Sequence, residues 1–491
     1  MTDILGPSGL DGRTEIGAAE LRAALGAVDR LPFPRYAGLA DAIRDLVFEG
    51  RLTPGARLPA ERELAATLGT SRVTVSAAYR QLREQGWATA RHGSGTFTAA
   101  ATNPARGWLP RAGSGWIELA HAAPAAPPEL HPAYVRALAR LPSMLSGHGY
   151  YADGLPDLRA AIAQRFTQRG LPTAADQILV TAGTGDATAV AFSALVRPGD
   201  RVLLEHPTYP GAVEHVVERG GRCITVVMDA ADPDAWVAAA ARAAAESAPR
   251  AAFLMPDFSN PSGAQLSPGA RGRLAATLWR HGVVTIADEV SVELGLDEGT
   301  TQLPPYGAGL PDSATITVGG LSKAVWGGVR IGWLRSDAAV VAELGMSFGR
   351  RQLTVSALDQ LVALELLAEL DPILEGQRTR LRPQRQALLD ALAQRLPQWQ
   401  VRRPGGGLSL WCELPPELSS TAIVAAAGPR GLRLAPGTMF GTGHAFDQRL
   451  RLPYTRPVEE LQAAVGILAD VTEAIGSRSA IFATSSPTRV A

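Results

Sequence analysis

The chain has 491 residues and a formal net charge of zero, with 47 basic and 47 acidic residues. This length exceeds what one ordinary core holds, so two or more domains are expected. No apolar run reaches the roughly 18 residues that cross a bilayer, and the N-terminus lacks the basic and apolar segments of a signal peptide. We therefore expect a cytoplasmic protein with no membrane partner. Cys223 and Cys412 form no metal-ligand spacing, which predicts buried thiols and no metal site.

Changes in composition divide the chain into five parts. Residues 1–33 form a short leader with one plausible helix at 18–28, and residues 34–99 form a compact, charge-rich block. Residues 100–115 are rich in Ala, Pro and Gly, which indicates a linker. Residues 116–475 alternate short apolar runs with helical patterns, and residues 476–491 have the composition of a disordered tail.

Residues 34–99 carry the pattern of three helices and a β-hairpin. YAGLADAIRDLVFEG and AERELAATLG each place apolar residues at helical spacing. TSRVTVSAAYRQLREQG predicts a third helix that begins at Thr70 or Ser71 as its N-cap. WATARHGSGTF then reads as two β-prone runs joined by a glycine-rich turn. Together these elements describe a winged helix-turn-helix.

The charge of this block agrees with a nucleic-acid partner. Residues 34–100 contain nine arginines and six acidic residues, a net charge of +3. A recognition helix docks with its N-terminal residues at base edges, so we expect Arg72 and Thr74 to face the bases. Arg62, Arg91 and His92 are placed for phosphates or the minor groove. The alternative is a small helical domain with solvated arginines.

The stretch from GRLTPGARLP to HGSGTF resembles the DNA-binding domain of the GntR family almost end to end. It shares the PG-x-x-LP turn, the R-E-L-A helix, the S-R-x-T-V helix start and the G-S-G-T-F wing. One departure is Ala60-Glu61, where a pair of serines is more usual, and this departure removes one expected phosphate contact. The resemblance implies double-stranded operator DNA as a partner and these contact residues: Arg62, Ser71, Arg72, Thr74, Arg91, His92, Gly93 and Gly95.

The large block alternates strands with helices, which predicts a mostly parallel sheet. A buried strand at Ile178–Val180 runs into the turn Gly183-Thr184-Gly185, and Ala187 begins a helix. Free backbone N–H groups at such a helix start make an anion site. Other strands end at residues that carry chemistry, and the carboxyl ends of parallel strands meet at one edge of a sheet. These residues are Tyr209, Asn260, Asp288 and Lys323.

Lys323 is the one lysine among the 47 basic residues of a chain that otherwise uses arginine. Unlike a guanidinium, a desolvated lysine amine can lose its proton and condense with an aldehyde to a Schiff base. Pyridoxal phosphate (PLP) needs such a lysine, an anion site for its phosphate and a carboxylate for its pyridinium nitrogen. Asp288 is the candidate carboxylate, and Arg330 is a second phosphate partner. Taken singly each has a structural explanation, but together they predict a PLP site.

Residues 116–475 resemble the fold-type I aminotransferases of the aspartate aminotransferase superfamily, through YYADGLPDLRAAIA, VTAGTGDA, PDFSNPSG and LSK-x6-R-x-GW. The resemblance implies that Asn260 bonds the phenolic oxygen of the ring and that Tyr209 stacks on its face. It also implies that Arg451 binds the carboxylate of an amino-acid-like effector. The other implied cofactor residues are Tyr150 or Tyr151 of a neighbouring subunit, Gly183, Thr184, Gly185, Asp288, Ser322, Lys323 and Arg330.

Two positions depart from the pattern of this family. Val290 and Ser291 stand where many relatives carry a tyrosine that donates to the phenolic oxygen. Gly320 stands where a phosphate-binding serine is frequent. We expect neither departure to prevent cofactor binding, but both count against efficient turnover.

A GntR-type reader, a linker and an aminotransferase-like domain form the architecture of the MocR/GabR regulators. We expect an α+β winged helix-turn-helix followed by an α/β PLP-dependent transferase fold, with a seven-stranded-type sheet and a small C-terminal α/β subdomain. The resemblance implies a homodimeric transcriptional regulator that senses PLP or an amino-acid-like effector. The alternatives are an active aminotransferase with an appended DNA-binding module, and a DNA-binding module whose large domain is empty.

Overall fold

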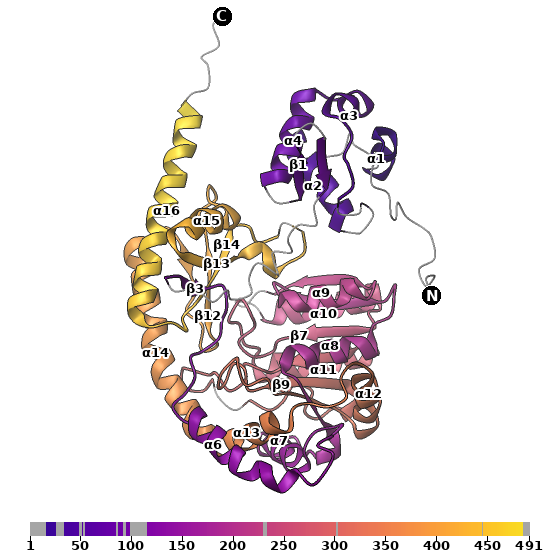
Figure 1. The fold of residues 1–491 in the computed structure, drawn as a ribbon, viewed down its shortest axis with the longest axis vertical. Helices are drawn as coiled ribbons and strands as arrows, with labels where there is room; N and C mark the ends of the chain where they lie inside the picture. The colour runs from indigo at the N-terminus through magenta and orange to yellow at the C-terminus, as the bar shows by residue number, and fades with distance from the viewer. Residues whose placement is uncertain are drawn as a thin grey trace, which may run out of the picture. The chain divides into compact units, whose positions relative to one another are not determined.

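A computed structural model describes residues 16–25, 34–48, 52, 55–84, 87–91, 95–98, 115–228, 233–300, 303–443 and 445–484. The chain divides into two compact units, an N-terminal unit of Met1–Arg111 and a C-terminal unit of Ala112–Ala491 (Figure 1). Within the described ranges, no helix combines the length and apolar character that crossing a membrane requires. Each unit is described below by itself.

The N-terminal unit is a set of short helices followed by a two-stranded hairpin. Its elements in chain order are α1 (Ala18–Leu25), α2 (Arg35–Phe48), α3 (Glu61–Leu68), α4 (Arg72–Glu84), β1 (Ala88–Arg91) and β2 (Gly95–Thr98). The strands pair antiparallel, with Arg91 opposite Gly95. Leu64, Val75 and Tyr79 share one core with Leu21 of α1. The leader therefore adds a helix to the core of the winged helix-turn-helix.

The turn between α3 and α4 has well-defined ends. Gly69 ends α3 in the left-handed conformation, with φ of 64°, which glycine adopts without a steric cost. Ser71 is the N-cap of α4, because its Oγ accepts the main-chain N–H of Thr74 at 3.1 Å. The hydroxyl of Tyr79 donates to the carbonyl of Pro59 at 2.9 Å. These contacts fix α4 against the start of α3.

The C-terminal unit is built on a seven-stranded sheet. The alternation of strands and helices predicted its mostly parallel pairing, and the resemblance implied its seven strands. In spatial order the strands are β4 (Ile178–Thr181), β10 (Gly332–Arg335), β9 (Thr315–Gly320), β8 (Val284–Asp288), β7 (Ala251–Leu254), β5 (Arg201–His206) and β6 (Arg222–Val227). β10 is antiparallel to both of its neighbours, and the other pairs are parallel. The predicted fold class is confirmed.

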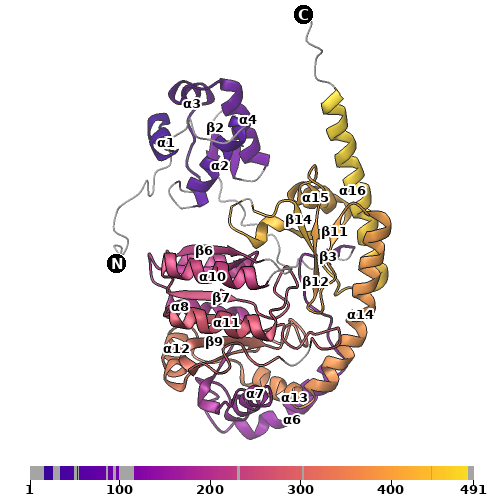
Figure 2. The same cartoon turned by 180° about the vertical axis from the view of Figure 1, so that it is seen from behind.

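Helices cover both faces of this sheet. Leu204 and Phe253 pack in one hydrophobic cluster with α8 (Thr184–Leu195), whereas Leu203 and Leu254 pack in another with α10 (Pro233–Ser247) and α11 (Pro268–Arg280). This alternation along each strand is that of a sheet buried on both sides. Figure 2 shows α10 and α11 on the face seen from behind. The remaining helices around the sheet are α6 (Leu130–Arg140), α7 (Pro156–Gln168), α9 (Pro210–Glu218), α12 (Ala338–Arg351) and α13 (Ala357–Ala368).

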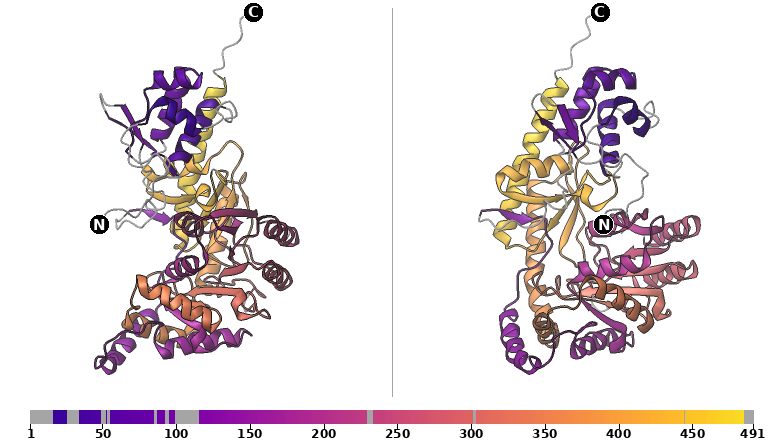
Figure 3. Two further views of the ribbon diagram at one scale, coloured as in Figure 1. Left: turned by 90° about the vertical axis from the view of Figure 1, so that its right-hand side faces the viewer. Right: turned by 45° about the vertical axis from the view of Figure 1, so that its right-hand side comes forward.

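A smaller five-stranded sheet forms the rest of this unit. Its spatial order is β11 (Gln400–Val401), β12 (Ser409–Glu413), β14 (Arg449–Pro453), β13 (Leu432–Pro436) and β3 (Ile117–Leu119). It packs with α15 (Ser420–Ala427), α14 (Leu370–Arg395) and α16 (Val458–Thr484). Figure 3 shows α14 and α16 side by side. α14 connects the two sheets, because Ile373 lies in the core of the large sheet and Leu388 in that of the small one.

Two predicted boundaries differ from the structure. α8 begins at Thr184 and so takes the glycine turn into its first helical turn, three residues before the predicted start. α16 continues to Thr484, so residues 476–484 of the predicted disordered tail are helical. The helix can continue through these residues because the sequence has no proline there before Pro487. Residues 485–491 lie outside the described part of the chain, as do the predicted linker up to residue 114 and most of the leader.

Candidate functional site

The carboxyl ends of the parallel strands bring the predicted chemistry-bearing residues to one edge of the large sheet. Asp288 ends β8, and Lys323 follows β9 by three residues. Tyr209 follows β5 and Asn260 follows β7. The charges of Asp288 and Lys323 each act on the pKa of the other, which places both side chains in one site.

Lys323 is held with its amine largely enclosed. Its Nζ donates to the carbonyl of Ala122 at 2.8 Å. Burial and, to a smaller extent, the cation of Arg451 lower the pKa of Lys323 to about 8, against the opposing charge of Asp288. A larger fraction of this amine is therefore neutral near pH 7 than for an exposed lysine. A neutral amine is the form that attacks an aldehyde.

Asp288 supplies a buried carboxyl on the same side of the sheet. Burial raises the pKa of Asp288 to about 6, and a main-chain hydrogen bond from Val290 at 3.0 Å opposes that rise. Val290, at the position where many relatives carry a tyrosine, thus binds Asp288 through its backbone. A buried carboxyl of this kind can hold a proton on a ring nitrogen, because the ion pair replaces the solvation that each partner loses.

The start of α8 forms a cradle in which backbone, glycine and arginine meet. Gly183 is the N-cap with φ of 98°, and a Cβ added to it would lie 3.1 Å from the guanidinium carbon of Arg330. Arg330 Nη2 donates to the carbonyl of Ala182 at 2.9 Å. Exposed N–H groups of a helix start, together with one guanidinium, bind phosphate.

Glycine at position 320 has a local explanation. A Cβ at Gly320 would collide with Oγ1 of Thr184, whose hydroxyl lies 3.4 Å from the carbonyl of Gly319. The serine that is frequent at this position in relatives therefore does not fit beside Thr184. In this chain a hydroxyl at the start of α8 occupies the space that the side chain at position 320 would need. Ser322, next to Lys323, is half-buried in the same region.

Tyr209 is the N-cap residue of α9 and packs tightly against its first turn. A Cβ at Gly211 would lie 2.5 Å from the Tyr209 ring, so glycine is required there. Burial raises the pKa of Tyr209 to about 12, with the charge of Asp288 adding to the rise. The phenol therefore stays protonated and offers a flat, neutral ring to the site.

Arg451 reaches the site from β14 of the small sheet. Its Nη1 donates to Oδ1 of Asn260 at 3.0 Å, and its Nη2 donates to the carbonyl of Ala120. Arg451 lies over the Phe440 ring at 4.8 Å, and burial lowers the pKa of its guanidinium to about 10. Among the described residues, its Nε has no hydrogen-bond partner. A buried guanidinium with an unused donor suits a carboxylate ligand.

Tyr150 lies apart from these residues. It is 57% exposed, and its ring packs on His148 with the centroids 5.6 Å apart. Tyr151 is half-buried, and its main-chain N–H donates to Thr354 Oγ1 at 3.2 Å. One copy of the chain therefore does not bring Tyr150 into the set. Its predicted role requires a second copy.

Glu205, inside the apolar strand β5, is a buried carboxyl near the site that the sequence pattern did not predict. Its carboxyl is fully buried and accepts from the Met255 N–H at 2.8 Å and from Ser259 Oγ at 3.0 Å. Burial raises the pKa of Glu205 to about 8. Both donors flank the loop that ends at Asn260, so Glu205 positions that loop. The sequence signal that could have indicated this residue is a single glutamate within the apolar run of RVLLEH.

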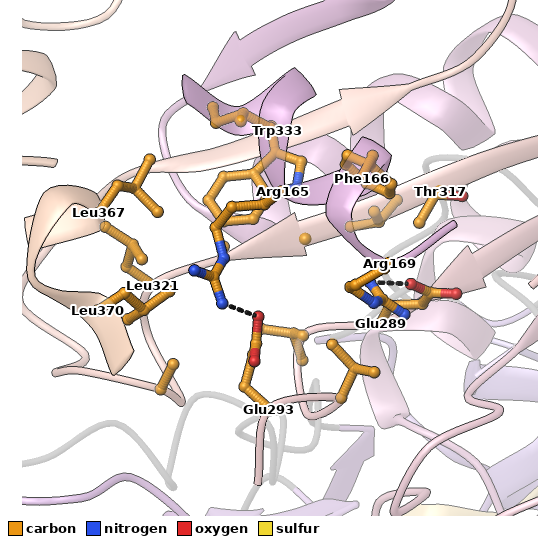
Figure 4. A pocket seen from close by; sticks show the side chains of 17 residues that line it. Arg165, Phe166, Arg169, Glu289, Glu293, Thr317, Leu321, Trp333, Leu367 and Leu370 are labelled. Atoms are coloured by element: carbon orange, nitrogen blue, oxygen red, sulfur yellow. Dashed lines mark hydrogen bonds and ion pairs between the residues drawn. The ribbon is translucent and has the colours of Figure 1, made fainter. Parts of the chain in front are cut away.

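A second group of charges joins α7 to the segment that follows β8 (Figure 4). From α7, Arg165 contacts Glu293 at 2.9 Å and Arg169 contacts Glu289 at 2.8 Å. These side chains and apolar ones from β9, β10 and α13 line a pocket of about 40 Å³. This volume holds a few water molecules and no cofactor. The two ion pairs attach α7 to the segment that directly follows Asp288.

Within the described ranges, no three residues among His, Cys, Asp and Glu are grouped so as to hold a metal ion. The residues present do fit PLP, because an enclosed amine, a buried carboxyl and a phosphate cradle lie at one strand edge.

The N-terminal unit presents its predicted DNA-contact residues on and around α4. Arg72 is exposed, and its Nε lies 3.5 Å from Glu61 Oε2 at the start of α3. Thr74 is half-buried, and its Oγ1 lies 2.8 Å from Ser71 Oγ. Glu61, which replaces a serine of the family pattern, therefore orients Arg72. Arg62 is exposed on α3.

The predicted wing is described only in part. Arg91 ends β1, and Gly95 opens β2 with φ of 107°. A Cβ at Gly95 would lie 3.3 Å from Arg57 Nε. His92 and Gly93, predicted as wing contacts, lie outside the described residues.

Comparison with known families identifies both units. Residues 35–98 match the family of bacterial regulatory proteins, gntR family. Residues 130–468 match the family aminotransferase class I and II. An uncharacterized HTH-type transcriptional regulator of Escherichia coli (strain K12), YdcR, is 28% identical over 85% of this chain and 94% of its own length. Because 85% of this chain exceeds the length of the C-terminal unit, the alignment extends into the N-terminal unit.

Proteins named as enzymes match the C-terminal unit. A 2-aminoadipate transaminase of Thermus thermophilus is 30% identical over 62% of this chain and 75% of its own length. The solved structure of α-aminoadipate aminotransferase LysN from the same organism, complexed with N-(5'-phosphopyridoxyl)-L-leucine, superposes with a TM-score of 0.69. That structure is 27% identical and covers 77% of this chain and 96% of its own. The chain therefore belongs to the aminotransferase class I and II family and carries a GntR-family DNA-binding region at its N-terminus.

Proposed function

We propose that this protein is a PLP-dependent transcriptional regulator of the MocR/GabR type. The observation that carries the proposal is an enclosed lysine with a lowered pKa, grouped with Asp288, Asn260 and Tyr209, in a chain that also carries a GntR-family reader. PLP bound in the C-terminal unit, alone or joined to an amino-acid-like effector, changes how the N-terminal unit binds double-stranded DNA. For this to occur, the effector must bind two conformations of the protein with different affinities.

Each residue of the site has a separate task in this proposal. PLP supplies an aldehyde for an amine and a ring that withdraws electrons. Lys323 holds the aldehyde, and Asp288 holds the proton on the ring nitrogen. The start of α8, with Thr184, Gly185 and Ser322, holds the phosphate together with Arg330. Asn260 and Tyr209 hold the ring, and Glu205 positions the loop of Asn260.

The effector is proposed to be a carboxylate, bound through Arg451. In the described structure, Asn260 and Ala120 accept from two of the nitrogens of Arg451. A carboxylate bound there must replace these acceptors or use the remaining Nε. Because Ala120 follows β3 and Asn260 follows β7, the exchange would change the contact between the small and the large sheet. This is a physical route from effector binding to a change in conformation.

A homodimer is proposed because Tyr150 is exposed in one copy of the chain and its family role places it at the site of the other. Two readers in one dimer suit repeated half-sites on DNA. A DNA-binding regulator of a bacterial type is expected to act in the cytoplasm.

The second candidate is an aminotransferase that the N-terminal unit only tethers to DNA. The likeness to a named transaminase favours it. The missing tyrosine after Asp288 disfavours fast turnover, since Val290 and Ser291 supply no phenol to the ring oxygen.

One experiment separates the two candidates. The purified full-length protein, supplied with PLP, is mixed with a panel of amino acids, and both the cofactor absorbance and keto-acid release are followed. The regulator predicts a spectral change without sustained keto-acid release, and a DNA footprint upstream of its own coding sequence that changes with PLP. Keto-acid release at enzyme-like rates with an unchanged footprint would select the enzyme. A protein that stays colourless with PLP would reject both.

A further inference from the structure

The outer face of α4 carries an apolar side chain that the stability of the fold does not explain. Val73 is 77% exposed. The buried residues of α4, among them Val75, Tyr79 and Leu82, lie on the opposite face of the helix. Val73 therefore makes no contribution to the core of the N-terminal unit.

Helix propensity also fails to explain this valine. Val restricts its own rotamers in a helix and forms helices less readily than Ala, Glu, Lys or Arg. An exposed position of α4 gains nothing from Val73 in the free protein, and an isolated exposed valine is in itself unremarkable. What distinguishes Val73 is its position in the first turn of the helix that enters the major groove in a helix-turn-helix.

The chemistry of that first turn is limited. The hydroxyls of Ser71 and Thr74 lie 2.8 Å apart, and Ser71 also caps the helix. Arg72 has its Nε beside Glu61, which leaves its two Nη groups for a base edge. Val73 has only methyl groups to offer. Ala77 lies one turn further along the same face and is small and half-buried, so its side chain does not prevent α4 from approaching the DNA closely.

We infer that Val73 is a specificity-determining residue that contacts the C5-methyl group of a thymine in the operator. The major groove exposes one apolar group, the thymine methyl, and apolar side chains recognise it there. Cytosine at the same position presents an amino donor, which a valine would leave without an acceptor. The inference rests on the proposed DNA binding and adds a base preference to it.

The test removes a single methyl group from the DNA. Full-length protein with PLP selects its sites from a random duplex library, and each thymine of the selected site is then replaced by uracil. Because uracil differs from thymine only in that methyl group, we expect one thymine per half-site at which uracil weakens binding about fourfold, the value of one buried methylene. In Val73→Ala, which loses both γ-methyl groups and keeps only Cβ, the same replacement should have a clearly smaller effect.

Two controls keep the result specific. Val135→Ala removes a valine of similar exposure, 54%, from α6 of the C-terminal unit, and should leave the uracil effect intact. Val73→Ala should not lower the melting temperature, because Val73 is exposed and alanine favours the helix. A lower melting temperature or an altered oligomeric state of Val73→Ala would overturn the inference, because Val73 would then serve the fold or a protein contact.

The outcomes also separate this inference from the proposed function. If a site is selected but no uracil replacement depends on Val73, the inference fails and the DNA binding stands. If no sequence is enriched over the starting library, the DNA-binding proposal fails and the inference fails with it.

Discussion

The two units of this protein place their functional side chains in opposite environments. Arg62 and Arg72 of the N-terminal unit are exposed, whereas Asp288 and Arg451 of the C-terminal unit are buried. Water solvates the exposed cations, so what the protein determines is where their charges lie. Buried groups have their protonation set by the protein, as the lowered pKa of Lys323 and the raised pKa of Asp288 illustrate.

This contrast predicts how each unit responds to substitution. Changes on the exposed face of the N-terminal unit should alter DNA affinity and leave the fold intact. Changes at the strand edge of the C-terminal unit should alter chemistry, pH dependence and packing together. The predictions below test whether the two units can be altered separately.

The largest effect is expected from Lys323→Ala. Without the amine, the aldehyde of PLP has no covalent partner, so the absorbance of the Schiff base should disappear. Non-specific DNA affinity, which depends on phosphate contacts, should remain nearly unchanged at two salt concentrations. Absorbance spectra and fluorescence anisotropy with a random duplex measure the two quantities.

A matched variant sharpens this result. Lys323→Arg keeps the cation and loses the nucleophile, so it should lack the Schiff-base absorbance as Lys323→Ala does. A Schiff-base absorbance that persists in either variant would show that another amine holds the cofactor, because Lys323 is the chain's one lysine.

Arg72→Ala is expected to weaken operator binding by about 1–3 kcal/mol, the value of a lost bidentate contact to a base. The C-terminal unit should keep its cofactor absorbance unchanged. Arg62→Ala serves as the comparison, because a lost phosphate contact weakens binding to all sequences alike and lowers the salt dependence. An unchanged footprint for Arg72→Ala would reject its role at a base.

The same contrast explains how much of the site the sequence could predict. Strand runs that end at Asp288 and shortly before Lys323 are local patterns, so the shared edge of the sheet follows from parallel pairing. The helix-turn-helix is likewise local, and its Ser71 cap was readable as one of two candidates.

Contacts between distant segments were not readable in this way. The hydrogen bond from Arg451 to Asn260 joins residues 191 positions apart. The ion pair of Glu61 with Arg72 depends on how two helices cross, and the sequence alone shows Glu61 only as a departure from a family pattern. Glu205 is visible as a charge inside an apolar run, but its partners Met255 and Ser259 come from another strand and the loop after it.

The attachment of PLP to the apo-protein should depend on pH with an inflection near 8. Burial and Arg451 disfavour the protonated amine of Lys323, so its pKa falls to about 8 from the ordinary 10.5. Below that pH the neutral fraction, and with it the initial rate, should fall about tenfold for each pH unit. Stopped-flow absorbance over pH 6–10 measures this rate.

Two variants should move that inflection in opposite directions. The carboxylate of Asp288 raises the pKa of Lys323, so Asp288→Asn should shift the inflection to lower pH. The cation of Arg451 lowers that pKa, so Arg451→Gln should shift the inflection to higher pH. Shifts of the same sign would contradict the electrostatic account of this site.

The smallest effect is expected from Ser71→Ala. The Ser71 hydroxyl accepts the Thr74 N–H at the start of α4, and losing such a cap costs about 1 kcal/mol of stability. Thermal unfolding of the full-length protein should show a lower midpoint for the transition of the N-terminal unit alone, with the cofactor absorbance lost at an unchanged temperature. Ser419 is the N-cap of α15, and its Oγ accepts the Ala422 N–H at 3.2 Å. Ser419→Ala removes this cap and should lower the midpoint of the C-terminal unit instead. If either substitution lowered both midpoints equally, the two units would unfold as one, and a change in the reader could not be separated from a change at Lys323.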